Sequence, residues 1–167
     1  MICVDEFGPL ELRPQAGRSW QRQKKPARFR ATYTRPHGVR HLLSHYDVGK
    51  DELHGHFKPR KRSCDFLVFL KAIRRRYSGT IWIVLDNLSA HRTDEVMRWA
   101  GKNNARFRFT PTNASWLNRI ECEFTSLKKA TLTHCDYGSF GEMREAIQDW
   151  IYWRNQRKAR LLKLKGH

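Results

Sequence analysis

An unbroken apolar run, Ile81 to Leu85 (IWIVL), constrains the fold of this chain more than any other stretch. Five apolar, mostly β-branched residues in succession are typical of a strand covered on both faces, as in a largely parallel sheet flanked by helices. The run ends at Asp86 and Asn87. A buried carboxylate is costly unless a cation or hydrogen bonds compensate it. Asp86 therefore indicates either a charged site at the edge of the sheet or a simple turn cap.

The segments around this strand complete an α/β pattern. Apolar residues at helical spacing predict a crossover helix over residues 64–77, with Ser63 as its N-cap and Gly79 after its end. After the strand, Thr93 is expected to cap a short helix that ends near Gly101. The alternating sequence ARFRF (residues 105–109) predicts a further strand before Pro111.

Two helices are predicted to close the chain, because apolar residues step by three and four from Trp116 onward and again from Phe140 onward. At the other end, Ile2 to Val4 predict a first strand that Gly8-Pro9 stops. Residues 38–48 and 51–57 predict a hairpin, and the basic stretch before it predicts a loop with one short strand near residues 29–33.

Positive charge dominates the composition. The 167 residues, enough for one domain, contain 33 Lys and Arg against 16 Asp and Glu, a net charge of +17, and residues 12–46 contain no acid. Further basic blocks are Lys58–Arg62 and Arg154–Lys165. Such an excess favours a polyanionic partner, in the first place nucleic acid, and 12% aromatic residues argue against a disordered basic tail.

The four cysteines form no Cys-x-x-Cys pair, and no secretory segment precedes them, so we expect reduced cytoplasmic thiols and no structural zinc site. No apolar run is long enough to span a membrane.

Acids end two of the predicted strands. Asp5 follows the first strand as Asp86 follows Ile81–Leu85, and if these strands are parallel neighbours, both carboxylates lie at one sheet edge. Glu121 or Glu123 would supply a third acid. Each lies about 80° from the centre of its helix's apolar stripe, so periodicity leaves the choice open. Three carboxylates suit Mg²⁺ or Mn²⁺, and two such ions support phosphodiester cleavage.

Three blocks carry a family resemblance: VDE at residues 4–6, LDNLSAH at 85–91, and TPTNASWLNRIECEFTSLKK at 110–129. They resemble the acidic motifs of the DDE transposase and integrase superfamily, specifically the bacterial insertion-sequence branch of the mariner superfamily. The 34 residues between Asp86 and Glu121 match the family's spacing. The resemblance, which covers about residues 4–153, selects Glu121 over Glu123. It implies a ribonuclease-H-like fold: a mixed five-stranded sheet flanked by helices.

The resemblance also implies roles for individual residues. Asp5, Asp86 and Glu121 would be the catalytic residues and the ligands of two Mg²⁺ or Mn²⁺ ions. Glu6, Asn87 and His91 would support them, although His91 equally suits a capping or packing role. Trp116 and Trp150 are expected in the core rather than as base-stacking platforms. The expected catalytic domain is 1–155, followed by a basic tail, 156–167. The residues expected to contact DNA are Arg60, Lys61, Arg62, Arg119, Lys128 and Lys129.

The implied function is DNA transposition: metal-dependent cleavage at the transposon end, then transfer of the freed 3′-hydroxyl to target DNA at TA dinucleotides. The expected partners are double-stranded DNA, a second copy of the chain, and an N-terminal helix-turn-helix module on another chain. Met1 stands only four residues before Asp5, which suggests a second reading frame or a truncated remnant. A non-catalytic DNA-binding remnant and a cellular ribonuclease-H-like nuclease are the alternatives. The expected location is the bacterial cytoplasm, at the nucleoid.

Overall fold

A mixed five-stranded sheet forms the centre of the protein in the computed structural model, which describes residues 1–15, 23–25 and 37–165, with side chains up to residue 157. The strand order is β3-β2-β1-β4-β5. The first three strands pair antiparallel, whereas β1 with β4 and β4 with β5 pair parallel. This confirms the predicted sheet. The strands are β1 (Ile2–Glu11), β2 (Val39–Asp47), β3 (Glu52–Lys58), β4 (Ile81–Leu85) and β5 (Ala105–Phe109).

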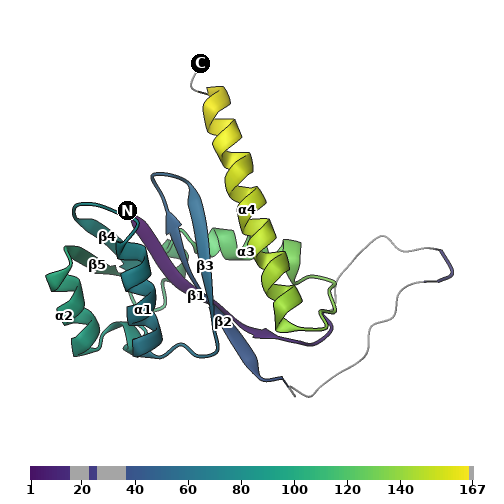
Figure 1. The fold of residues 1–167 in the computed structure, drawn as a ribbon, viewed down its shortest axis with the longest axis horizontal. Coiled ribbons are helices and arrows are strands. Elements are labelled where there is room, and N and C mark those ends of the chain that lie inside the picture. Colours follow the sequence, from purple (N-terminus) through teal and green to yellow (C-terminus); the bar gives the residue numbers. More distant parts are fainter. Residues whose placement is uncertain (16–22, 26–36, 166–167) are drawn as a thin grey trace.

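Helices cover both faces of the sheet (Figure 1). One core contains side chains of α1 and α2 with Ile2, Val4 and Leu85, and the other contains side chains of α3 and α4 with Cys3 and Leu42. The alternation along β1 is the period-two pattern of a strand buried on both faces. The helices are α1 (Ser63–Arg74), α2 (Asp94–Lys102), α3 (Glu121–Thr131) and α4 (Phe140–Lys165), with short 3-10 turns η1 (Ser89–His91) and η2 (Ser115–Leu117).

The first strand runs further than the sequence predicts. Gly8-Pro9 does not stop it, because β1 continues to Glu11 through a register shift between Phe7 and Leu10. Gly8 has a φ of +147°, and a Cβ there would lie 3.2 Å from the Arg40 carbonyl oxygen, so only glycine suits this irregularity. The predicted stop was therefore wrong.

Helix starts also differ in detail. The crossover helix is present, but Arg62 occupies its N-cap position and Ser63 is its first helical residue. The helix predicted from Trp116 onward begins only at Glu121. The short strand predicted near residues 29–33 lies outside the described residues. The backbone of α4 is helical through Lys165, so the basic segment 156–167 begins within that helix.

No helix in the described part of the chain is both long and apolar enough to cross a membrane. The four cysteines, all within that part, are free thiols.

Candidate catalytic site

Parallel pairing of β1 and β4 brings two of the predicted acids to one edge of the sheet. Ile2 lies opposite Ile83 and Cys3 opposite Val84. The same offset, continued along both strands, places Asp5 opposite Asp86, the residue that directly follows β4. Asp86 follows the carboxyl end of β4, a position where open α/β sheets collect ligands. The prediction that Asp5 ends its strand was wrong, because β1 continues past Asp5 to Glu11, paired with β2.

Asn118 fastens the third acidic segment to this edge. Its side-chain nitrogen donates to the Val4 carbonyl oxygen at 2.8 Å and lies 3.3 Å from an Asp5 carboxylate oxygen. The side chain is fully buried, and its amide oxygen has no hydrogen-bond partner. The backbone N–H of Glu121 donates to the Asn118 carbonyl at 3.1 Å, so Asn118 connects the start of α3 to the first half of β1. Sequence reasoning missed this residue, although it is the asparagine of the third family motif.

The surroundings of Asp5 disfavour its ionised form. Burial raises the pKa of Asp5 to about 7, and the nearby carboxylates of Glu121, Asp86 and Glu6 add to the increase. The backbone N–H of Glu6, which donates to Asp5 at 2.7 Å, opposes it. The carboxylates around Asp5 therefore carry more negative charge than the nearby positive groups compensate. A bound cation would stabilise the ionised form of Asp5.

His91 links two acids through its two ring nitrogens. Nε2 lies 2.7 Å from Glu6 Oε1 and Nδ1 lies 2.8 Å from Asp86 Oδ1, while the ring packs 4.0 Å from the Phe66 ring centre. Burial alone would lower the pKa of His91, but the contacts with Asp86 and Glu6 raise it to about 9. The hydrogen bond from His91 in turn lowers the pKa of Asp86. The imidazolium thus keeps Asp86 ionised and fixes its position.

Asn87 connects the ends of β4 and β5. Its side-chain nitrogen donates to the Thr110 carbonyl at 2.5 Å, and its oxygen accepts from Arg92 at 3.0 Å. Asn87 therefore holds the loop that carries Asp86.

Glu123, the alternative that helix phase left open, belongs to a different network. Both of its carboxylate oxygens accept hydrogen bonds from Arg154 of α4, at 2.8 and 2.9 Å. Arg154, whose side chain is 7% exposed, also pairs with Asp51 in the β2–β3 turn. Asn155 bonds both backbone groups of Leu53. Glu123 thus helps to dock α4 on the sheet, whereas Glu121 is free of that network.

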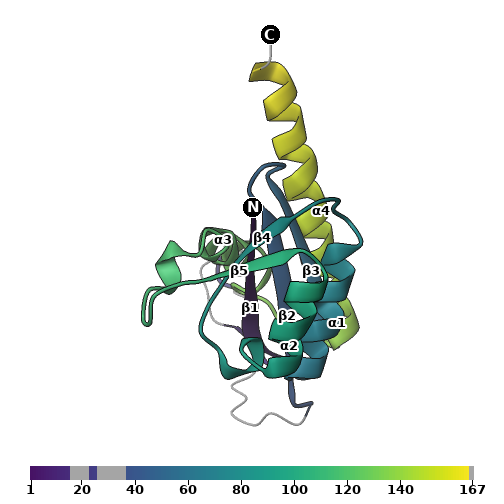
Figure 2. The ribbon, with the colours of Figure 1, turned by 90° about the vertical axis from the view of Figure 1, so that its left-hand side faces the viewer.

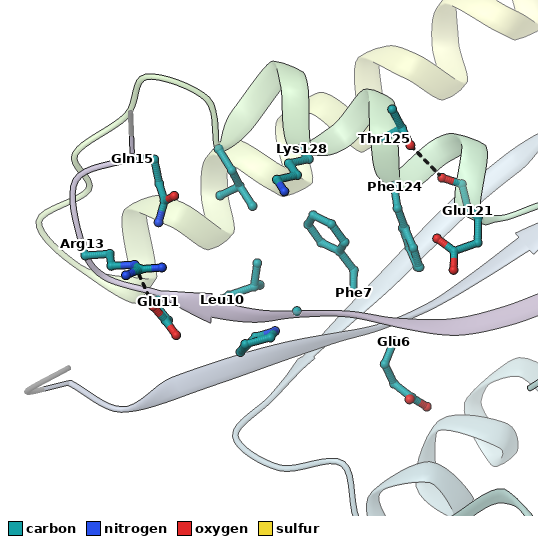
Figure 3. A pocket seen from close by; sticks show the side chains of 13 residues that line it. Glu6, Phe7, Leu10, Glu11, Arg13, Gln15, Glu121, Phe124, Thr125 and Lys128 are labelled. Carbon is teal, nitrogen blue, oxygen red and sulfur yellow. Dashed lines mark hydrogen bonds and ion pairs between the residues drawn. The ribbon is translucent and has the colours of Figure 1, made fainter. Parts of the chain in front are cut away.

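A groove of about 620 Å³ opens beside Glu121, between the second half of β1 and α3 (Figure 3). Phe7 and Phe124, with ring centres 5.1 Å apart, line it together with Lys128. Glu121 lies on this side of β1, whereas Glu6 points to the other side, toward His91 (Figure 3). The acids therefore approach the sheet edge from both faces.

The carboxylates lie near one another without forming a finished metal site. Within the described ranges, no three His, Cys, Asp or Glu side chains are arranged to hold a metal ion. Asp5, Asp86 and Glu121 influence one another electrostatically, since both of the others raise the pKa of Asp5. Their oxygen donors are the type that Mg²⁺ and Mn²⁺ prefer, and the unpartnered amide oxygen of Asn118 is a further polar atom beside them.

The predicted DNA-contacting residues lie on the surface. Lys61 also lies close enough to Asp86 to contribute to lowering its pKa. All six residues of this set are exposed: Arg60, Lys61, Arg62, Arg119, Lys128 and Lys129.

The two tryptophans considered from the sequence behave differently. Trp150 is half-buried against the core under α3 and α4, as predicted. Trp116 is 73% exposed, so its prediction as a core residue was wrong. The cause is the break in helical structure before Glu121: the fully buried Asn118 takes an extended backbone conformation, and the apolar spacing that begins at Trp116 never becomes one helix face.

Comparisons with known proteins agree with this geometry. The chain is 28% identical over 157 residues to a 39 kDa protein of insertion element IS630 from Shigella sonnei, covering 90% of this chain and 44% of that protein. Its fold is similar to the Mos1 transposase in a paired-end complex with the left transposon end (TM-score 0.69, 18% identity) and in a strand transfer complex (TM-score 0.69, 16% identity). These similarities cover 94% of this chain and 51% and 50% of the Mos1 chains. The chain thus spans about half the length of these relatives.

The family comparison covers most of the chain. The DDE superfamily endonuclease family matches residues 1–144, a range that includes Asp5, Asp86 and Glu121. The order of strands, the sheet edge at which the acids gather and this match agree, and the chain belongs to the DDE superfamily endonuclease family.

Proposed function

We propose that this chain is the catalytic domain of a DNA transposase, with Asp5, Asp86 and Glu121 as its catalytic residues. The observation that carries the proposal is the convergence of three distant segments at one sheet edge, through the β1–β4 register and the Asn118 hydrogen bonds. The reaction would be cleavage of a phosphodiester at the end of an insertion element, followed by transfer of its 3′-hydroxyl to target DNA.

The same three carboxylates would hold divalent cations, two Mg²⁺ or Mn²⁺ ions in the full site. When bound, the ions would supply activation of the attacking oxygen and stabilisation of the leaving oxygen. The raised pKa of Asp5 supports this assignment, since a cation would let this carboxylate ionise at neutral pH.

Neighbouring residues would hold these ligands in place. His91 fixes Asp86 through one ring nitrogen and Glu6 through the other. Asn118 fixes Asp5 and the start of α3, while Asn87 anchors the loop after β4. Groups around metal ligands that set their orientation contribute strongly to metal affinity.

The substrate would be double-stranded DNA at element ends and at the target. The net charge of +17 and the exposed lysines and arginines supply the sequence-independent part of its binding. Selection of the ends would come from a helix-turn-helix module, and joining two ends would require a second copy of the chain. Such a protein would work on chromosomal DNA in the bacterial cytoplasm.

The test is cation-dependent nicking of supercoiled plasmid DNA. Wild-type protein is expected to nick in Mg²⁺ or Mn²⁺ and not in EDTA, and Asp86→Asn is expected to abolish nicking. Asp149→Asn provides a charge-matched control, because Asp149 is exposed on α4 and lies outside the three motifs. Equal activity of wild type and Asp86→Asn would refute the proposal. Salt-sensitive DNA binding without any nicking would instead support a non-catalytic DNA-binding protein.

A further inference from the structure

Two large apolar side chains stand exposed on the short turn η2. Trp116 is 73% exposed and Leu117 is 59% exposed. Tryptophan offers a large flat surface for stacking. Covering such a surface with a partner lowers the free energy, because apolar area is removed from water. The residues around this pair, Ala114, Ser115, Asn118 and Arg119, are small or polar.

The turn that carries them is held at both ends. Ala114, which is 7% exposed, donates its N–H to Pro111 and accepts from Leu117, each at 3.1 Å. On the other side, the fully buried Asn118 donates its N–H to Ser115 at 2.8 Å and its side chain bonds β1. The exposure of Trp116 is therefore built into a fixed turn and does not arise from a loose loop.

The position of this turn relates it to the acids. Trp116 is two residues from Asn118, which lies 3.3 Å from Asp5, and five residues from Glu121. Arg119, exposed on the same segment, adds a positive charge beside it. The segment between β5 and α3 projects from the body of the protein (Figure 2). An aromatic surface with a neighbouring cation, next to a site for phosphodiester chemistry, has the features of a single-strand stacking platform.

We infer that Trp116 stacks on a nucleobase of the DNA strand whose phosphodiester is held by Asp5, Asp86 and Glu121, with Arg119 contacting the adjacent phosphate. The inference rests on the proposed function and adds a recognition residue to it. The positive charge of the chain and the continuity of the turn with the acidic site favour DNA over a second protein copy as the occupant. Stacking on an unpaired base would hold a separated strand end near the carboxylates.

The experiment uses the complete 167-residue chain in EDTA with a short duplex that carries a single-stranded 3′ overhang. The difference in fluorescence between wild type and Trp116→Phe isolates Trp116 among the six tryptophans. We expect this difference emission to be strongly quenched by DNA. Trp116→Ala should weaken binding by about tenfold, as expected for loss of one stacked base, and Trp116→Phe should retain affinity within about threefold.

Trp153 provides the matched control, since it is 65% exposed but lies on α4. Trp153→Ala should change affinity by less than about twofold if the effect depends on position and not on surface tryptophans in general. Equal losses in both alanine variants, or Trp116 emission unaffected by saturating DNA, would overturn the inference. Burial of Trp116 that depends on protein concentration without DNA would also overturn it, in favour of a protein interface.

This readout separates the inference from the catalytic proposal, because it involves no cleavage. Asp86→Asn should show the same quenching of Trp116 as wild type. Quenching without nicking would support stacking by Trp116 and contradict the catalytic proposal. Nicking without quenching would support the catalytic proposal and contradict stacking by Trp116.

Discussion

Replacing Asp5 by asparagine should stabilise the metal-free protein at alkaline pH. The folded pKa of Asp5 is about 7, against an ordinary value of 3.8, so between these pH values the folded state retains a proton that the unfolded state has lost. The stability that this proton provides is complete below pH 3.8 and is lost as pH rises through 7. An asparagine side chain at this position removes the titration while retaining nearly the same shape.

The difference between the two pKa values corresponds to a loss of at most ~4 kcal/mol of unfolding free energy at pH 8, relative to pH values below 3.8. Because Asp5 is only partly buried, solvent screening should reduce this to about 2 kcal/mol. The expected result is that Asp5→Asn is as stable as wild type near pH 4 and about 2 kcal/mol more stable at pH 8.

Urea unfolding in EDTA at several pH values measures this difference. Subtracting wild type from variant removes the contributions of other titrating groups. Saturating Mg²⁺ should stabilise wild type and cancel the advantage of the variant, since the cation compensates the carboxylate. A difference between wild type and Asp5→Asn that does not vary with pH would show that Asp5 does not have a raised pKa in the folded protein.

Three further substitutions test other parts of the structure. Arg154→Ala leaves the carboxylates of Glu123 and Asp51 without their buried partner, and should cost about 3 kcal/mol of unfolding free energy in urea. Burial lowers the pKa of His45 to about 3, so stability should fall by ~1.4 kcal/mol per unit as pH drops below 6.5, and His45→Phe should flatten that part of the profile. His91→Gln should raise the Mg²⁺ concentration needed for nicking by about 10- to 100-fold, measured by titration of the cation; an unchanged requirement would contradict its positioning role.

Much of the fold could be predicted because local patterns and tertiary structure agree in the central strands. Ile81, Ile83 and Leu85 are buried beneath α1 and α2, and the hairpin of β2 and β3 follows its turn residues. The prediction that β4 is covered on both faces was only partly right, because Trp82 on the other face is 44% exposed and Val84 is half-buried. The extension of β1 past Gly8-Pro9 could not be predicted, because β2 supplies the pairing that keeps the strand extended.

The candidate site shows the same division. Acids expected at strand ends signalled Asp5 and Asp86, although β1 in fact continues past Asp5 to Glu11. The choice of Glu121 over Glu123 depended on the family resemblance. The contact that supports that choice comes from Arg154, more than thirty residues away, which donates to both oxygens of Glu123. The exposure of Trp116 was missed because Asn118 leaves helical structure to bond β1, a long-range contact that helical periodicity does not encode.

A crystal structure of the protein with Mn²⁺, using anomalous scattering to locate the ion, tests whether Asp5, Asp86 and Glu121 form one cation site. We expect an anomalous peak within about 2.5 Å of carboxylate oxygens of both Asp5 and Asp86, with Glu121 turned toward the ion or its water. Strong anomalous peaks at other acidic residues, with none beside Asp5 and Asp86, would contradict the claim that these carboxylates form one cation site.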